Sequence, residues 1–192
     1  MPMKIEIRSD SVLIGGYVNA TEKKSRPVIT PHGKVVEVIE PRAFEAAIGR
    51  AGDITVTVDH EKTHVYASTR EGTLKLYEDN IGLHAETIIT DPTVIELAKK
   101  GKIKGWSFGM YNVVDQLEAR ADDLPLRRIK SLDIDHVTLV VKKTPCYSAT
   151  SVEVRAEGEI DIETRTVDVT STETKKDLNA DFRARFEKLK KS

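Results

Sequence analysis

Short β-branched segments that helices do not regularly separate constrain the fold of this chain most strongly. Ile54, Val56 and Val58 alternate strictly with polar residues, which is the period of a half-buried strand. Further strand-like segments lie at 4–8, 12–18, 35–39, 74–77, 81–85, 103–114 and 129–141. A doubly wound parallel sheet needs a helix between successive strands. We therefore expect an α+β, β-dominated fold, a mostly antiparallel barrel or sandwich with a few helices outside it.

Two segments carry the signals of helices. Residues 41–48 begin with Pro41, whose missing N–H costs nothing in the first turn of a helix. Residues 91–101 combine an Asp91 cap, Pro92 at the first helical position and a glycine after the last turn. We expect a helix in both places.

Two connections follow from local composition. The turn-like residues 78–80 separate the strand-like segments 74–77 and 81–85, so these two should form a hairpin. The polar segment 115–126 is typical of a loop between two strands.

The chain divides into a body and an appendage. We expect one domain over residues 1–157, a linker or edge strand over 158–174, and a basic amphipathic helix or tail over 175–192. The tail contains seven Lys or Arg residues and three Asp or Glu residues, so its net charge is +4, whereas the net charge of the whole chain is -1. A partner that docks on this tail and a solvated terminal helix are equally compatible with the pattern.

Composition excludes several classes of protein. The single cysteine, Cys146, rules out an internal disulfide framework and a four-cysteine zinc site. No segment approaches the roughly 20 apolar residues of a membrane helix, and the N-terminus has no apolar signal region, so we expect neither a membrane partner nor secretion. The near-zero net charge also argues against a dedicated nucleic-acid binder.

The segment 60–64 fits the pattern H-E-x-x-H. On a helix, His60 and His64 would share a face and bind zinc, while Glu61 would activate water. A strict strand alternation runs up to this segment and β-favouring residues follow it, so we expect a loop instead. A zinc metallopeptidase built on these three residues remains the first alternative function.

The segment 105–109 fits G-x-S-x-G around Ser107. In α/β-hydrolases this pattern is a sharp turn between a strand and a helix, but here strand-like residues continue to Val114. We therefore reject the hydrolase elbow. A serine exposed at the edge or end of a strand, with glycines that let another backbone approach closely, and an ordinary serine of a glycine-rich strand both remain open for Ser107.

The order of several segments resembles the prohead maturation proteases of tailed bacteriophages, which are related to herpesvirus assemblins. The similar segments are 14–18, 38–44, 59–61, 82–85, 93–100, 105–109 and 136–140 followed by Pro145. The resemblance covers about residues 10–155. In the segment 38–44, Arg42 stands where the family pattern has glycine.

The resemblance implies an assemblin-like β-barrel and a serine protease without a cofactor or metal. Its catalytic residues would be Ser107 as nucleophile, His60 as general base and His136 as the group that orients His60. Many relatives have glutamate at the third position, whereas a second imidazole is a chemically reasonable substitute here. Asp135 and Asp133 lie close by in sequence, but strand alternation predicts that both face away from His136.

The resemblance also implies a place of action and partners. Such a protease acts inside the immature capsid in the host cytoplasm, cleaves the major capsid protein and scaffold protein, and usually cuts itself. No direct contact with nucleic acid is expected, and a homo-oligomer remains open. The second alternative function is a non-catalytic capsid assembly or scaffold-binding module.

The remaining candidates have simpler structural interpretations. We expect His32 in a turn, His64 on the surface and His84 as a structural residue of a strand. We expect Cys146 to be a small buried residue, Trp106 to lie in the core, and Lys142–Lys143 to form a solvated strand end.

Overall fold

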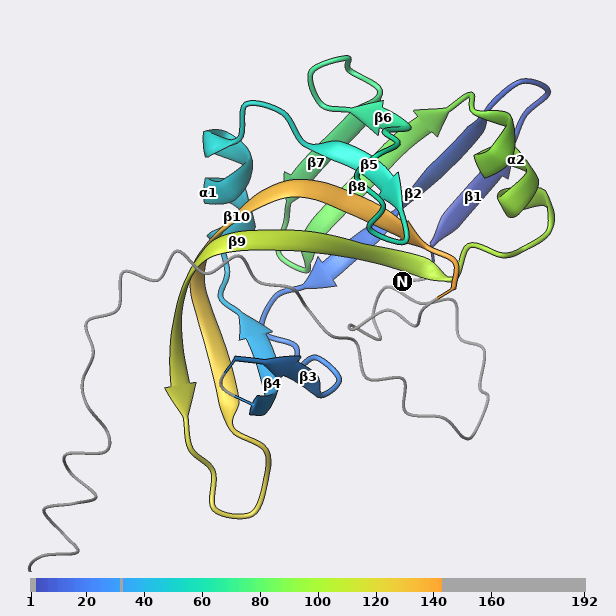
Figure 1. The fold of residues 1–192 in the computed structure, drawn as a ribbon. Coiled ribbons are helices and arrows are strands. Elements are labelled where there is room, and N and C mark those ends of the chain that lie inside the picture. The colour runs from blue at the N-terminus through green and yellow to red at the C-terminus, as the bar shows by residue number, and fades with distance from the viewer. Residues whose placement is uncertain (1–2, 32, 143–192) are drawn as a thin grey trace, which may run out of the picture.

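The computed structural model describes residues 3–31 and 33–142, which form two β-sheets and two flanking helices (Figure 1). The predicted tail over 175–192, the linker over 158–174, and residues His32, Lys143 and Cys146 lie outside the described residues. Neither described helix is long and apolar enough to cross a membrane.

The first sheet is antiparallel and has the strand order β1-β2-β8-β7. Its strands are β1 (Lys4–Ile7), β2 (Val12–Ala20), β7 (Leu74–Glu78) and β8 (Gly82–Ile89). The predicted hairpin between β7 and β8 is confirmed. Asp79 organises its turn by accepting hydrogen bonds from the backbone N–H groups of Ile81 and Gly82.

Tyr17 of β2 ties this turn to the neighbouring strand. Its hydroxyl donates to Asp79 Oδ2 over 2.6 Å. This hydrogen bond, together with burial, raises the pKa of Tyr17 to about 12. His84 packs edge-on against Tyr17 and stacks on Tyr77, in keeping with the structural role expected for it.

The second sheet is built around one long strand, β10 (Leu126–Val140). Along one edge β10 pairs antiparallel with β9 (Gly105–Glu118). Its other edge pairs with two strands in parallel, β4 (Gly33–Ile39) in its first half and β5 (Thr55–Val58) in its second half. The short strands β3 (Val28–Thr30) and β6 (Ala67–Ser68) extend the sheet beyond β4 and β5.

The two sheets pack face to face rather than closing into a barrel. Within the described residues each sheet keeps its own end strands, and one core contains residues of both sheets, such as Ile14, Leu83, Phe108 and Leu139. The expected β-barrel is therefore wrong, while the β-dominated α+β class is correct. The barrel fails because the second sheet ends at β3, β6 and β9, and within the described residues these strands pair neither with one another nor with the first sheet.

The two helices flank the sheets, and their N-termini differ from each other. Helix α2 (Pro92–Lys99) begins as predicted, with the Asp91 side chain accepting from the Thr93 N–H over 2.8 Å. Helix α1 (Ala43–Arg50) begins two residues later than predicted, because Pro41 precedes the cap rather than occupying the first turn.

The segment expected to be a loop over 115–126 is mostly strand. β9 continues to Glu118 and β10 already begins at Leu126, so only residues 119–125 connect them. Cross-strand ion pairs link the two strands of this hairpin, for example Arg128 with Glu118 at 3.2 Å. Arg127, one residue nearer the connection, pairs with the fully buried Glu37 of β4 at 2.9 Å.

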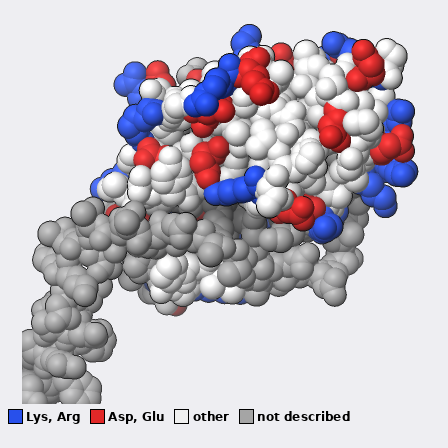
Figure 2. All heavy atoms as spheres, turned by 45° about the horizontal axis from the view of Figure 1, so that its top comes forward, with Lys and Arg blue, Asp and Glu red and all other residues white. Residues whose placement is uncertain are grey.

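The surface carries both signs of charge. On the face drawn in Figure 2, Lys and Arg side chains alternate with Asp and Glu side chains around an uncharged centre. The described part of this face presents no broad basic area of the kind that tracks a nucleic-acid backbone.

Candidate active site

The turn after β5 presents His60. Asp59 and His60 both have positive φ, 48° and 63°, a conformation that residues other than glycine seldom adopt. The His60 N–H donates to the Thr138 hydroxyl over 3.0 Å, and Asp59 Oδ1 accepts from the Val141 N–H over 2.8 Å. Contacts from β10 therefore hold an unfavourable turn in one conformation, as is common at functional sites.

Ser107 lies on β9 directly opposite Thr138 of β10, and it is only 4% exposed, so the expectation of an exposed serine is wrong: pairing with β10 and packing against the core bury it. The strand continues without a turn to Glu118, so the predicted absence of a hydrolase elbow is confirmed. Gly109 lies two residues further on and faces His136. A Cβ atom at Gly109 would lie 2.1 Å from His136 Cε1, so the glycine makes room for the imidazole.

The structure brings the three predicted residues together in one line of contacts. Ser107 Oγ lies 3.2 Å from His60 Nε2, and His60 Nδ1 lies 2.9 Å from His136 Nε2. The two imidazole rings are nearly perpendicular, at 86°. This is the arrangement of a nucleophile, a base and a group that orients the base.

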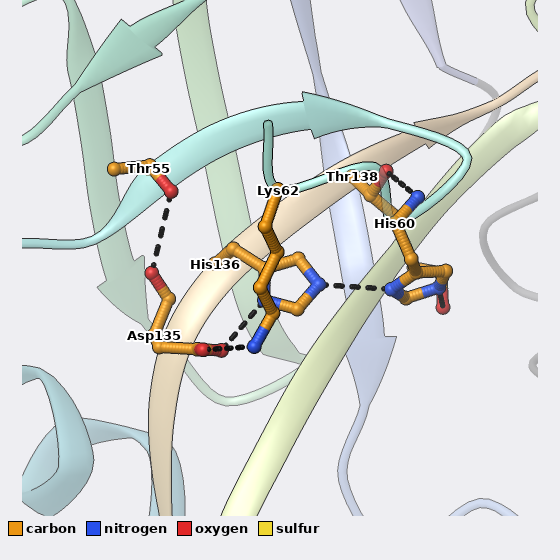
Figure 3. Close-up of polar contacts among 7 residues, drawn as sticks. Thr55, His60, Lys62, Asp135, His136 and Thr138 are labelled. Carbon is orange, nitrogen blue, oxygen red and sulfur yellow. Dashed lines mark hydrogen bonds and ion pairs between the residues drawn. The ribbon is translucent and has the colours of Figure 1, made fainter. Parts of the chain in front are cut away.

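Asp135 extends this line, although strand alternation placed it on the other face. Its Oδ1 lies 2.6 Å from His136 Nδ1, and its Oδ2 accepts from Lys62 Nζ over 2.5 Å (Figure 3). The prediction for Asp135 is therefore wrong. Ile134 pairs with Met110 and His136 pairs with Gly109, so Asp135 is an extra residue without a partner on β9. Such a bulge redirects side chains that alternation would separate.

The Asp135 carboxylate is strongly stabilised in its ionised form. Partial burial opposes ionisation, but the hydrogen bonds from His136 and Lys62 outweigh it and hold the pKa of Asp135 well below its usual range. Asp133 faces elsewhere, as expected, and accepts from Arg50 over 2.7 Å and from Asn112 over 3.0 Å.

The H-E-x-x-H segment is a turn and not a helix. His60 points to Ser107 and His136, whereas His64 lies against Tyr66 and pairs with Asp91 at 3.6 Å. Among the described residues no three His, Cys, Asp or Glu side chains are grouped to hold a metal ion. The zinc alternative therefore lacks the helical face that it requires.

Two further residues take the places expected for them. Trp106 is 1% exposed and belongs to the core. Lys142 is a solvated strand end whose Nζ approaches Glu61 only to 4.0 Å.

Three residues at the site have no role in the sequence prediction: Asp59, Thr138 and Asp135. Asp59 and Thr138 hold the His60 turn through the backbone, which no residue pattern reveals. Asp135 had a usable signal, because a carboxylate beside a candidate functional histidine is a common orienting partner. Only the bulge decides that it faces His136.

Comparison with known proteins identifies the kind of chain that carries this site. The family model described as caudovirus prohead serine protease matches residues 2–164. No curated protein and no solved structure matches the chain.

Proposed function

The chain belongs to the caudovirus prohead serine proteases, and we propose that Ser107, His60 and His136 are its catalytic residues. The substrates we propose are segments of the major capsid protein and the scaffold protein inside the procapsid, in the host cytoplasm. We propose that the enzyme also cleaves itself.

One observation carries this proposal. Two contacts connect the three side chains: Ser107 Oγ lies 3.2 Å from His60 Nε2, and His60 Nδ1 lies 2.9 Å from His136 Nε2. The three residues come from β9, from the turn after β5 and from β10, so local sequence proximity does not explain their meeting.

The geometry supports acyl transfer. As Ser107 Oγ attacks the scissile carbonyl carbon, its proton passes to His60 Nε2, and the carbonyl π electrons move to the oxygen. Collapse of the tetrahedral intermediate breaks the C–N bond, and the leaving amine takes the proton from His60. Water then repeats the sequence on the acyl-enzyme and regenerates Ser107. His136 accepts from His60 Nδ1–H and stabilises the imidazolium.

The direct test uses Ser107→Ala. Wild type, Ser107→Ala and Ser131→Ala proteins are incubated with the cognate capsid and scaffold proteins, and the products are measured by mass spectrometry. Ser131 is the matched control, because it is a half-buried serine of β10 that lies opposite Val114, away from His60. We expect cleavage by wild type and Ser131→Ala, and none by Ser107→Ala.

The same experiment separates the alternatives. Activity that survives Ser107→Ala and stops with a chelator would favour the zinc metallopeptidase of His60, Glu61 and His64. Full-length capsid, scaffold and enzyme chains in every sample would favour the non-catalytic assembly module and contradict the protease.

A further inference from the structure

The Asp135 carboxylate joins two groups, one through each of its oxygens. Oδ1 contacts His136 Nδ1, and Oδ2 contacts Lys62 Nζ at the far end of the turn that also carries His60 (Figure 3). His136 is 3% exposed, whereas the Lys62 side chain is 64% exposed. The line of contacts thus runs from the buried serine to a surface ion pair.

The hydrogen-bonding capacities of these groups give the line a direction. An ionised carboxylate can only accept, so His136 Nδ1 must carry the proton that it shares with Asp135. In a neutral imidazole the other nitrogen is then an acceptor, which makes His136 Nε2 the acceptor for His60 Nδ1–H. His60 Nε2 is left unprotonated and faces the Ser107 hydroxyl.

The opposite tautomer of His136 would reverse this order. With the proton on His136 Nε2, the hydrogen bond would require His60 to accept at Nδ1 and to carry its own proton on Nε2. His60 would then donate to Ser107 and could not take its proton. The choice of tautomer at His136 therefore decides whether His60 can act as a base.

We propose, on the basis of the function proposed above, that Asp135 is a positioning residue that fixes the tautomer of His136 and thereby prepares His60 to accept the Ser107 proton. Asp135 and His136 together supply the orientation and negative charge that a single carboxylate supplies in other serine proteases. Lys62 holds the carboxylate through its other oxygen.

Two features of the fold make this arrangement specific to Asp135. The bulge at Asp135 leaves it without a partner on β9, and Gly109 leaves space for the His136 ring. Asp133 lies two residues earlier on the same strand, yet its carboxylate contacts Arg50 and Asn112. It offers a matched control with the same side chain in the same strand.

The kinetic test compares Asp135→Asn with Asp133→Asn. An asparagine at 135 can accept from His136 or donate to it, so it keeps the size of the side chain but no longer selects one tautomer. We expect kcat to fall about 10- to 100-fold, as when the partner of a metal-bound histidine is removed, with little change in KM. Asp133→Asn should keep the wild-type kcat.

The second measurement reads the tautomer itself and needs no activity. Imidazole ¹⁵N NMR spectra are recorded in the Ser107→Ala background, with and without Asp135→Asn. We expect His136 in the Nδ1–H form in the first protein and a mixture of both forms in the second. Lys62→Gln, a change at an exposed side chain, should keep the Nδ1–H form and lower kcat less than Asp135→Asn.

Either an unchanged kcat or an unchanged His136 tautomer in Asp135→Asn overturns the proposal. A wild-type protein that cleaves nothing contradicts the proposed function instead, and the NMR result then judges the role of Asp135 on its own. The two failures are therefore distinguishable.

Discussion

At the scale of single residues, Gly109 shows how closely the site is packed. The missing side chain leaves the space that the His136 ring fills, and a Cβ atom there would overlap three atoms of the ring. Gly109→Ala should displace His136 from His60 and lower kcat about 100-fold, since a shift of about 1 Å in a catalytic group has effects of this size.

The control for this change is Gly49→Ala. A Cβ atom at Gly49 meets nothing within 4 Å, and the residue lies in α1, where alanine is favoured over glycine. Both variants are compared in a peptide-cleavage assay, with circular dichroism to verify folding. Equal activity of a folded Gly109→Ala protein and the wild type would contradict the packing argument.

The residues that meet at the site were predictable to different degrees. Ser107, His60 and His136 follow from motif segments in a family-like order, and the structure places them in contact. Asp135 was assigned to the wrong face because alternation assumes a regular strand. The bulge arises from the way β10 pairs with β9, and the sequence of β10 alone does not reveal that pairing.

At the scale of secondary-structure elements, the start of α1 contains a strained residue. Arg42 has φ 70°, a conformation that costs an L-residue about 1–2 kcal/mol. Glu78 of β7 holds this start by accepting from the backbone N–H groups of Arg42 and Glu45, each over 2.7 Å. The family pattern that this segment resembles has glycine at this position, which fits the left-handed backbone.

This strain gives a stability prediction. Arg42→Gly and Arg42→Ala remove the same exposed side chain, but only glycine relieves the backbone. We expect Arg42→Gly to be more stable than Arg42→Ala by about 1 kcal/mol, measured by urea denaturation. Equal stability of the two variants would contradict this prediction.

Elements with local signals were predicted well, and those defined by pairing were not. Asp91 and Pro92 define the start of α2 by their own chemistry. The strand ends over 115–118 are polar and were assigned to a loop, because their stabilising contacts, such as Arg127 with Asp115, come from the partner strand. β3 and β6 are too short to carry a pattern.

At the scale of the whole molecule, several carboxylates stabilise the fold only when they are ionised. Burial opposes ionisation of Asp79 and Asp91, but hydrogen bonds from neighbouring groups outweigh it and hold the pKa of each below its usual value. At Asp133 the hydrogen bonds from Asn112 and Arg50 lower the pKa. These groups anchor a hairpin turn, the start of α2 and the link between β10 and α1.

This pattern predicts acid sensitivity. A carboxyl whose folded pKa is depressed contributes stability that is fully present above its unfolded pKa, about 3.9 for Asp. Below that pH the unfolded chain binds more protons, so the free energy of unfolding should fall as the pH falls. Urea denaturation at a series of pH values measures this slope. Asp79→Asn should make the slope shallower, and an identical slope would contradict the assignment.

The overall architecture was the least predictable level. The β-dominated composition follows from local periodicity, but the number of sheets does not. β10 pairs with β4 and with β5, which precede it by about 90 and 80 residues in the chain, and such pairings leave no trace in the spacing of apolar residues. The barrel expected from the family resemblance is therefore replaced by two open sheets.

The central place of β10 also sets when the site can exist. β10 is the last of the described strands to leave the ribosome, and it supplies His136, Asp135 and the Thr138 hydroxyl that holds the His60 turn. A nascent chain that ends before β10 has Ser107 and His60 but lacks the strand that pairs with β9 and the Thr138 hydroxyl that holds the His60 turn. The proposed catalytic site is therefore complete only after the last described strand has been synthesised, so the self-cleavage proposed above would follow translation of the described body.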